Sequence, residues 1–163
     1  MRGHDWLYAL GDINGRALFT HMAKYQARIA ADRILGRDAS ATSEALGSPR
    51  VTFTDPQVAA VGLTLAGATE KGIDARAVDV DTAANAGASF HGRDAAGTSR
   101  IVVDEARRVL VGATFVGPET AELLHAATIA IAAQVGLDVL WHAVPAYPTR
   151  NEVWLKLLEE YGL

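Results

Sequence analysis

Ten residues near the end of the chain combine side chains capable of chemistry with a stiff backbone. Residues 145–154 read Pro-Ala-Tyr-Pro-Thr-Arg-Asn-Glu-Val-Trp, which places Tyr147 five positions before Glu152. Each proline fixes its own φ angle and lacks an amide donor, so the stretch favours an extended and inflexible loop. Such a loop can present a phenol and a carboxylate to a partner at a fixed separation. Tyr147 and Glu152 are therefore the candidate catalytic residues.

The same stretch also has a purely structural interpretation. Thr149 precedes a predicted helix at 150–160, and its hydroxyl could accept a hydrogen bond from the amide of Asn151 or Glu152. Thr-x-x-Glu is also the spacing of a capping box, in which Glu152 reaches back to the Thr149 amide. A stiff turn and a capped helix would then account for the pattern, and the spacing alone leaves both interpretations open.

A second carboxylate with possible function stands near the start of the chain. Trp6–Leu10 has the composition of a strand, Gly11-Asp12 follows it, and residues 18–35 have helical periodicity. A carboxylate between a strand and a helix N-terminus lies where hydroxylated or phosphorylated ligands often bind. Asp12 is therefore a candidate ligand-binding residue, and a turn or helix-capping role is the alternative.

The elements around these residues predict an α+β fold in which helices cover an antiparallel sheet. Residues 38–49 are rich in Ala, Ser and Gly without periodicity, which indicates a linker and a boundary. The predicted strands after it are 50–54, 57–63, 75–80, 99–103 and 108–116, and the predicted helices are 65–71, 119–135, 139–143 and 150–160. Strands and helices do not strictly alternate, which favours antiparallel over parallel pairing.

Several of these elements have local signals. Thr64 and Asp138 are the expected N-caps of the short helices at 65–71 and 139–143. Residues 104–107 are the expected turn of a hairpin, and the Gly- and Ala-rich stretch 81–97 is expected to be mostly a mobile loop.

The predicted helix at 119–135 is apolar on nearly every side. Ala, Leu, Ile and Val dominate it, with His125 and Gln134 as exceptions. A helix of this kind is buried on more than one side. In a domain of this size a second copy of the chain can cover the extra side, so the sequence predicts a homodimer.

Composition excludes several kinds of function. The 163 residues carry a net charge of −4, and the 15 Lys and Arg residues are scattered, which argues against a nucleic-acid partner. No apolar run reaches the roughly 20 residues that span a bilayer, and the first residues lack the apolar region of a signal peptide, so a cytoplasmic location is expected. The chain has no cysteine, its five histidines lack metal-ligand spacing, and no phosphate-binding loop is present; no metal site is therefore expected.

Four segments, in this order, resemble the pyridine nucleotide-disulfide oxidoreductases, the family that includes dihydrolipoamide dehydrogenase, glutathione reductase and mercuric reductase. The segments are Trp6–Asp12 with the helix carrying His21, Ala23 and Gln26; Phe53–Thr64; Gly112–Leu124; and Pro148-Thr149 with Glu152. The resemblance extends from Trp6 to about Leu158, which is nearly the whole chain.

The resemblance implies a fragment of a larger flavoenzyme. Residues 1–37 would be the C-terminal remnant of a FAD-binding domain, 38–49 a linker, and 50–163 the dimerisation domain. The parent would be a FAD- and NAD(P)-dependent oxidoreductase acting on a disulfide or another acceptor. Gly11 and Asp12 would be cofactor-binding residues, with the Asp12 carboxylate on the ribityl chain of FAD. Without the N-terminal FAD and NAD(P) domains, this chain would bind neither cofactor and would be inactive.

The closing motif departs from the family at one position. Tyr147 stands where many members have a catalytic histidine, which the glutamate at the position of Glu152 orients toward the partner subunit's site. A phenol has an unperturbed pKa of about 10 and is a poor base at neutral pH. Mercuric reductase also has tyrosine there, but it carries a C-terminal cysteine pair that this chain lacks. The alternative to a flavoenzyme part is a stand-alone, non-catalytic, dimeric binding module.

Overall fold

The computed structural model describes residues 3–4, 6–92 and 96–163 and divides the chain into two compact units. The N-terminal unit is Met1–Ser48 and the C-terminal unit is Pro49–Leu163. The observed boundary therefore falls at the C-terminal end of the predicted linker, residues 38–49. Among the described residues, none of the helices has the length and apolar character needed to cross a bilayer.

The N-terminal unit is helical. Its elements are the 3-10 helix η1 (Gly11–Asn14), the helix α1 (Thr20–Ile34) and the short helix α2 (Thr42–Leu46). Helix α1 agrees with the helix predicted at 18–35, whereas α2 lies inside the stretch predicted to be a linker. Met22 and Gln26, one turn apart on α1, are the buried residues of that helix.

The strand predicted at Trp6–Leu10 is wrong. No strand is assigned to these residues, and the side chains of Trp6, Tyr8 and Leu10 are exposed. An isolated strand has unpaired amide and carbonyl groups, and it is stable only beside another strand. Among the described residues, no strand pairs with Trp6–Leu10.

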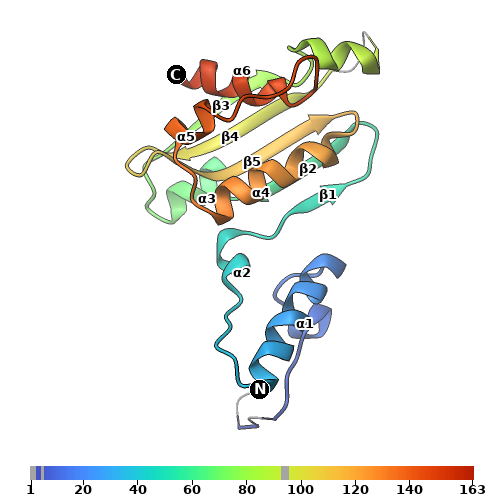
Figure 1. Ribbon diagram of the computed structural model, residues 1–163, viewed down its shortest axis with the longest axis vertical. Helices are drawn as coiled ribbons and strands as arrows, with labels where there is room; N and C mark the ends of the chain where they lie inside the picture. Colours follow the sequence, from blue (N-terminus) through green and yellow to red (C-terminus); the bar gives the residue numbers. More distant parts are fainter. Residues whose placement is uncertain (1–2, 5, 93–95) are drawn as a thin grey trace. The chain divides into compact units, whose positions relative to one another are not determined.

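The C-terminal unit is built on a five-stranded sheet in the order β1-β2-β5-β4-β3 (Figure 1). Each neighbouring pair is antiparallel. The strands are β1 (Arg50–Thr52), β2 (Gln57–Gly62), β3 (Ala75–Asp81), β4 (Thr98–Asp104) and β5 (Val109–Gly117). The predicted class, an antiparallel sheet covered by helices, is confirmed.

Strand register explains where the core lies. On the central strand β5, Phe115 lies between Ala59 of β2 and Ser99 of β4, and all three are fully buried. Two positions earlier, Ala113 is flanked in the same way by Val61 and Ile101, as the two-residue period of a strand requires. This face is the core of the unit. The opposite face meets solvent in part, as is common in antiparallel sheets.

An ion pair marks the solvent-facing side of the sheet. Asp79 of β3 and Arg100 of β4 are register partners, and the Arg100 guanidinium makes two hydrogen bonds of 2.6 Å to the Asp79 carboxylate. The hydrogen bonds from Arg100 lower the pKa of Asp79. Both side chains are nearly half exposed, so water screens the attraction and the pair contributes at most about 1 kcal/mol.

Two helices, α4 (Leu124–Ala132) and α6 (Glu152–Tyr161), cover the core face of the sheet. The other helical elements of this unit are α3 (Leu65–Glu70), α5 (Leu137–Trp141) and the 3-10 helices η2 (Ala86–His91) and η3 (Thr120–Leu123). Helix α4 packs on β2 and β5, and α6 packs on β3 and β4, so the two helices divide the sheet between them (Figure 1).

Two local predictions are confirmed. The Thr64 hydroxyl accepts a hydrogen bond of 3.1 Å from the Gly67 amide and caps α3 as predicted. The β4–β5 hairpin turns where expected, because the Asp104 side chain accepts from the Arg107 amide at 3.0 Å and the Asp104 carbonyl accepts from the Arg108 amide at 2.8 Å.

Three other local predictions need correction. The helix predicted at 119–135 is a 3-10 turn followed by α4, which ends at Ala132. Helix α5 begins after Gly136, whose carbonyl accepts from two amides of the first turn, so Asp138 lies inside the helix and is not its cap. The stretch 81–97, predicted to be mostly a mobile loop, contains η2, which the Asn85 side chain caps by accepting from the Ala88 amide at 3.0 Å; residues 93–95 of that prediction lie outside the described residues.

Helix α4 has apolar residues on both its inner and outer sides. Leu124, Ala127, Ala130 and Ile131 are buried against the sheet. Away from these residues Ala126, which lines a cavity, and Ile129 are exposed, and Ile129 exposes 54% of its surface. The prediction of an unusually apolar helix therefore holds, and one side of it is uncovered in a single copy of this unit.

Tyr161, at the end of α6, links the helix to the hairpin turn. The side chain exposes 7% of its surface, its hydroxyl donates to Glu105 Oε2 at 3.1 Å, and the guanidinium of Arg76 lies 4.9 Å from the ring centroid. Burial, and next the hydrogen bond to Glu105, raise the pKa of the Tyr161 phenol above its usual value.

Tyr161 is expected to make the stability of the C-terminal unit fall at alkaline pH. As the pH rises, the unfolded chain loses the phenolic proton first, so the contribution is full below about pH 10 and disappears as the pH passes the higher folded value. Tyr161→Phe should cost about 1 kcal/mol at pH 7 and remove this part of the pH dependence. Urea unfolding between pH 7 and pH 11 measures both. An unchanged difference between the two proteins across that range would contradict the assignment.

Candidate active-site loop and cofactor-binding turn

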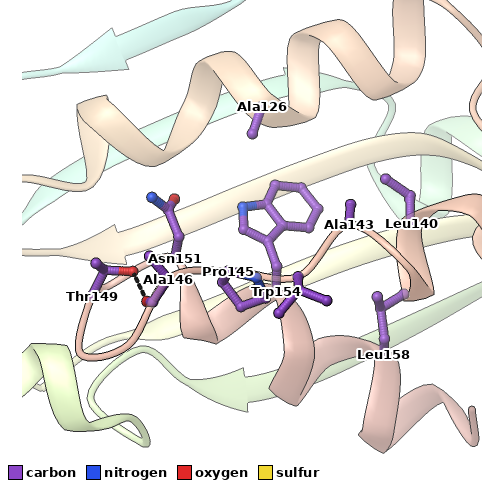
Figure 2. A pocket seen from close by; sticks show the side chains of 10 residues that line it. Ala126, Leu140, Ala143, Pro145, Ala146, Thr149, Asn151, Trp154 and Leu158 are labelled. Atoms are coloured by element: carbon purple, nitrogen blue, oxygen red, sulfur yellow. Dashed lines mark hydrogen bonds between the residues drawn. The ribbon is translucent and has the colours of Figure 1, made fainter.

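Tyr147 lies in the connection between α5 and α6, residues 142–151, which is called the Tyr147 loop below. The Tyr147–Pro148 peptide bond is cis, and the Tyr147 side chain exposes 79% of its surface. The loop is held on itself, because the Thr149 hydroxyl donates a hydrogen bond of 2.7 Å to the Ala146 carbonyl (Figure 2). The ring is therefore exposed on a turn with internal support, and its presentation to a partner together with the Glu152 carboxylate stays a prediction.

The capping-box interpretation of Thr149 and Glu152 is wrong. Helix α6 begins at Glu152, and its N-cap is Asn151, which makes no side-chain capping hydrogen bond. The Thr149 hydroxyl is directed back to Ala146, and the backbone carbonyl of Thr149, not its side chain, accepts from the Glu152 amide at 3.2 Å. The Thr149 hydroxyl, which the spacing predicted to cap the helix, instead forms a hydrogen bond within the turn.

Three buried polar atoms in the first turn of α6 and just before it have no hydrogen-bond partner among the described residues. They are Arg150 Nε, Glu152 Oε2 and Trp154 Nε1. A buried polar atom without a partner typically costs about 1–3 kcal/mol, so native proteins keep few of them. Their concentration within five residues indicates that this segment is not optimised for stability alone. Because Glu152 Oε2 has no partner, the exposed Tyr147 phenol does not bond to it.

Arg150 ties the Tyr147 loop to the end of the central strand. One terminal nitrogen of its guanidinium donates to the backbone carbonyl of Pro118, directly after β5. Burial lowers the pKa of Arg150, and the charge of Glu119 acts in the opposite direction. The hydrogen bond to the Pro118 carbonyl fixes the loop at Arg150.

An apolar cavity of about 390 Å³ opens beside the Tyr147 loop. The Trp154 indole stands in it between Ala126 of α4 and the loop, and Leu140 and Leu158 close the other end (Figure 2). The indole also packs edge-on against Phe115 of the sheet, with ring centroids 5.5 Å apart. The sheet core is thereby in direct contact with α6, the helix that begins at Glu152.

The candidate cofactor-binding residues, Gly11 and Asp12, form a tight turn in the N-terminal unit. Gly11 is buried with a φ of +71°, a conformation that side chains other than glycine rarely adopt, and a Cβ there would lie 3.2 Å from the Cβ of Ala23. Asp12 is exposed at the start of η1. An exposed carboxylate on a backbone held in this way can accept hydrogen bonds from the hydroxyl groups of a ligand, which fits a ribityl chain.

The residue that fixes this turn, Gln26, was named in the sequence only as part of the family resemblance and was given no role at the site. Gln26 of α1 is 6% exposed, and its Oε1 accepts from the Gly11 amide at 2.6 Å and from Asn14 Nδ2 at 2.8 Å. Its Nε2 donates to Glu44 at 2.8 Å, and Glu44 in turn pairs with Arg16. Gln26 thus supplies the hydrogen-bond acceptor for the Gly11 amide and holds the turn that carries Asp12. The available sequence signal was an uncharged polar residue on the buried side of α1.

The two pairs of predicted site residues lie in different units. Gly11 and Asp12 belong to the N-terminal unit, and Tyr147 and Glu152 belong to the C-terminal unit. Within the described part of the chain, no group of three or more His, Asp or Glu side chains is arranged to hold a metal ion.

Comparison with known proteins gives a consistent picture. Residues 48–158 match the family described as "Pyridine nucleotide-disulphide oxidoreductase, dimerisation domain". Dihydrolipoyl dehydrogenase from Chlamydia pneumoniae is 34% identical over 148 residues, which cover 91% of this chain and 32% of that protein. The dihydrolipoyl dehydrogenase of Mycobacterium tuberculosis strain H37Rv is 35% identical over 150 residues, or 92% of this chain and 32% of the relative.

Two solved structures have the same fold. The HOCl-induced flavoprotein disulfide reductase RclA from Escherichia coli has a TM-score of 0.82 at 24% identity, covering 93% of this chain and 35% of that one. LpdA from Mycobacterium tuberculosis has a TM-score of 0.83 at 23% identity, covering 96% of this chain and 34% of that one. The chain spans about a third of the length of these relatives. With residues 48–158 matched and the five-stranded sheet in place, the chain belongs to the pyridine nucleotide-disulfide oxidoreductases and carries their dimerisation domain.

Proposed function

We propose that the whole protein is a FAD- and NAD(P)-dependent oxidoreductase that acts on a disulfide or another acceptor, and that this chain supplies its dimerisation domain. The observation that carries the proposal is the family match over residues 48–158. Members of the family are FAD- and NAD(P)-dependent. The Gly11-Asp12 turn ahead of the matched region adds support, because it has the backbone and the exposed carboxylate that the family resemblance requires.

In this proposal the cofactors are bound mainly by domains outside this chain. Asp12 contributes a carboxylate to the ribityl chain of FAD, with Gly11 and Gln26 holding the turn. The remaining FAD-binding surface and the NAD(P) domain lie elsewhere in the whole protein. The chain alone therefore binds neither cofactor and is inactive. FAD, when bound, supplies electron transfer between the nicotinamide and the acceptor.

The C-terminal unit acts as one half of a homodimer. The uncovered apolar side of α4, with Ala126 and Ile129 exposed, is the surface that a second copy covers. Tyr147 then reaches the flavin site of the partner subunit from its exposed loop, where the phenol contacts the acceptor. Glu152 keeps a positioning role at the base of that loop. The cytoplasmic location expected from the sequence stays a prediction.

Replacing Ile129 with lysine is expected to break the dimer. A charge at an apolar contact must be desolvated on association, and losing a buried anchor typically costs 2 kcal/mol or more, which raises the dissociation constant about 30-fold. Ile129→Val retains an apolar surface and is the matched control. Sedimentation equilibrium of the chain and both variants gives the three constants. A wild-type chain that stays monomeric at high concentration, or a lysine variant that associates as tightly as wild type, would contradict the role of α4.

The redox proposal is tested on the whole protein. Purified whole protein should have the visible absorption of bound FAD, and NADH or NADPH should bleach it under anaerobic conditions. Asp12→Ala should lower FAD retention, with Asp38→Ala, an exposed carboxylate of the same unit, as the control. A colourless protein that FAD does not reconstitute would reject the flavoenzyme and favour a non-catalytic dimeric module.

A further inference from the structure

One residue outside the family motifs meets the backbone of the Tyr147 loop at very close range. Gly87, in η2, lies so close to residues 149–150 that a Cβ on it would be 2.5 Å from the Arg150 backbone nitrogen and would overlap the Thr149 carbonyl carbon. Real Cβ atoms do not approach other atoms to that distance. The φ angle of Gly87 is outside the left-handed region, so its own backbone would accept a side chain. The neighbouring loop is what excludes one.

The segment that carries Gly87 is itself fixed to the sheet. Asn85 caps η2 through the Ala88 amide, and its Nδ2 donates to the Thr82 carbonyl at 3.0 Å. Thr82 is 1% exposed, and its hydroxyl pairs with Ser99 at 2.8 Å and donates to the Val116 carbonyl at 2.9 Å. Buried and fully bonded hydroxyls of this kind rigidify their surroundings. These hydrogen bonds fix the position of Gly87 relative to the core strands β4 and β5.

The same two residues of the Tyr147 loop are held from a second direction. The Arg150 guanidinium donates to the Pro118 carbonyl, just beyond β5. Thr149 and Arg150 therefore lie between a backbone contact with Gly87 and a tether to Pro118. Tyr147 is only two residues before Thr149, so a displacement of this point moves the ring as well.

We propose that Gly87 is a positioning residue for Tyr147. Because Gly87 has no side chain, the Tyr147 loop can pack directly against the backbone of η2. Any side chain at position 87 pushes residues 149–150 away from η2 and shifts the loop relative to the partner's site. The catalytic part of this inference rests on the proposed function, whereas the structural part concerns this chain alone. Glycine is required by a close approach of two backbones and not by a turn.

The first test uses hydrogen exchange on this chain. In Gly87→Ala the amides of Glu152 and Val153, which donate to the Thr149 and Arg150 carbonyls, should exchange at least about 10-fold faster, whereas amides paired between β4 and β5 should keep their rates. Ser89→Ala is the matched control, because it removes the Ser89–Ala86 hydrogen bond within η2 and adds no atom against the loop. Unchanged loop exchange in Gly87→Ala, or an equal increase in both variants, overturns the proposal.

A second measurement needs no variant. In the wild-type chain, nuclear Overhauser effects should connect the Gly87 α-protons with the amide proton of Arg150. Their absence in an assigned spectrum of the folded chain overturns the contact even if Gly87→Ala does not fold.

The catalytic part is tested on the whole protein. Gly87→Ala should slow reduction of the acceptor about 10-fold or more while NAD(P)H reduces the flavin at the wild-type rate, because only acceptor reduction uses the loop. Acceptor reduction at the wild-type rate, with loop exchange raised, overturns the positioning role in catalysis. A whole protein that binds no FAD rejects the proposed function instead, and the exchange result still decides whether Gly87 positions the loop.

Discussion

Phe115→Ala is expected to destabilise the C-terminal unit by about 3–5 kcal/mol, the usual cost of removing a buried phenylalanine side chain. Phe115 is fully buried on the central strand, and its ring packs edge-on against Trp154. The substitution removes apolar contact with the sheet and with α6 together. Neighbours cannot easily fill the space, because its register partners Ala59 and Ser99 are small. Urea unfolding followed by far-UV circular dichroism measures the loss.

Phe53→Ala is the matched control for this prediction. Phe53 exposes 78% of its surface, so its truncation should change the free energy of unfolding by about 0.5 kcal/mol or less. Similar losses in the two variants would contradict the assignment of Phe115 to the core. Because the Phe115 ring packs against the Trp154 indole, the Phe115 variant should also alter tryptophan fluorescence.

Tyr147→His in the whole protein should raise the rate of dithiol–disulfide exchange with lipoamide about 100-fold, at the low end of what a positioned general base contributes. An imidazole has an unperturbed pKa of about 6.5 and accepts a proton at neutral pH, whereas a phenol with a pKa of about 10 does not. Glu152 Oε2, buried without a partner, is available to accept from the second ring nitrogen. The measurement is lipoamide reduction by NADH or NADPH, whichever reduces the flavin.

Two controls separate base chemistry from a change in shape. Tyr147→Phe keeps the ring and offers no base, so it should show no gain. Adding Glu152→Gln to the histidine variant should remove most of the gain and flatten its pH profile. If Tyr147→His gives no increase while the flavin is still reduced, the acceptor site differs from the lipoamide-reducing relatives at positions beyond residue 147.

The sheet was largely predictable because its signals are local. The two apolar runs at 99–103 and 108–116 and the turn residues at Asp104–Arg107 define the β4–β5 hairpin without reference to other parts of the chain. The Thr64 cap is equally local. By contrast, a strand exists only with a neighbour, so the apolar composition of Trp6–Leu10 could not decide its conformation. The capping box predicted from the Thr149–Glu152 spacing was wrong for another reason, because the Thr149 hydroxyl donates to the Ala146 carbonyl instead.

The sequence suggests which residues form the candidate site, and that assignment stays a prediction, but it does not indicate the residues that support them. Tyr147 and Glu152 stand out by residue type and spacing, and Gly11-Asp12 by its place between a predicted strand and a predicted helix and by the family resemblance. Gln26, Arg150 and Gly87 act through contacts with residues 15, 32 and 62 positions away. Periodicity and motif spacing carry no information about such contacts, because these depend on how the finished sheet brings distant segments together.

The strand order also has a consequence for how the chain is made. Strand β2 pairs on one side with the three-residue β1 and on the other with β5, where Ala59 lies opposite Phe115. A ribosome releases β2 well before β5, so the apolar edge at Ala59–Val61 waits for its main partner while β3, η2 and β4 are still being synthesised. Pairing over such a distance in sequence is slow compared with closing the β4–β5 hairpin. Residues 57–62 are thus expected to need chaperone protection until β5 has been synthesised.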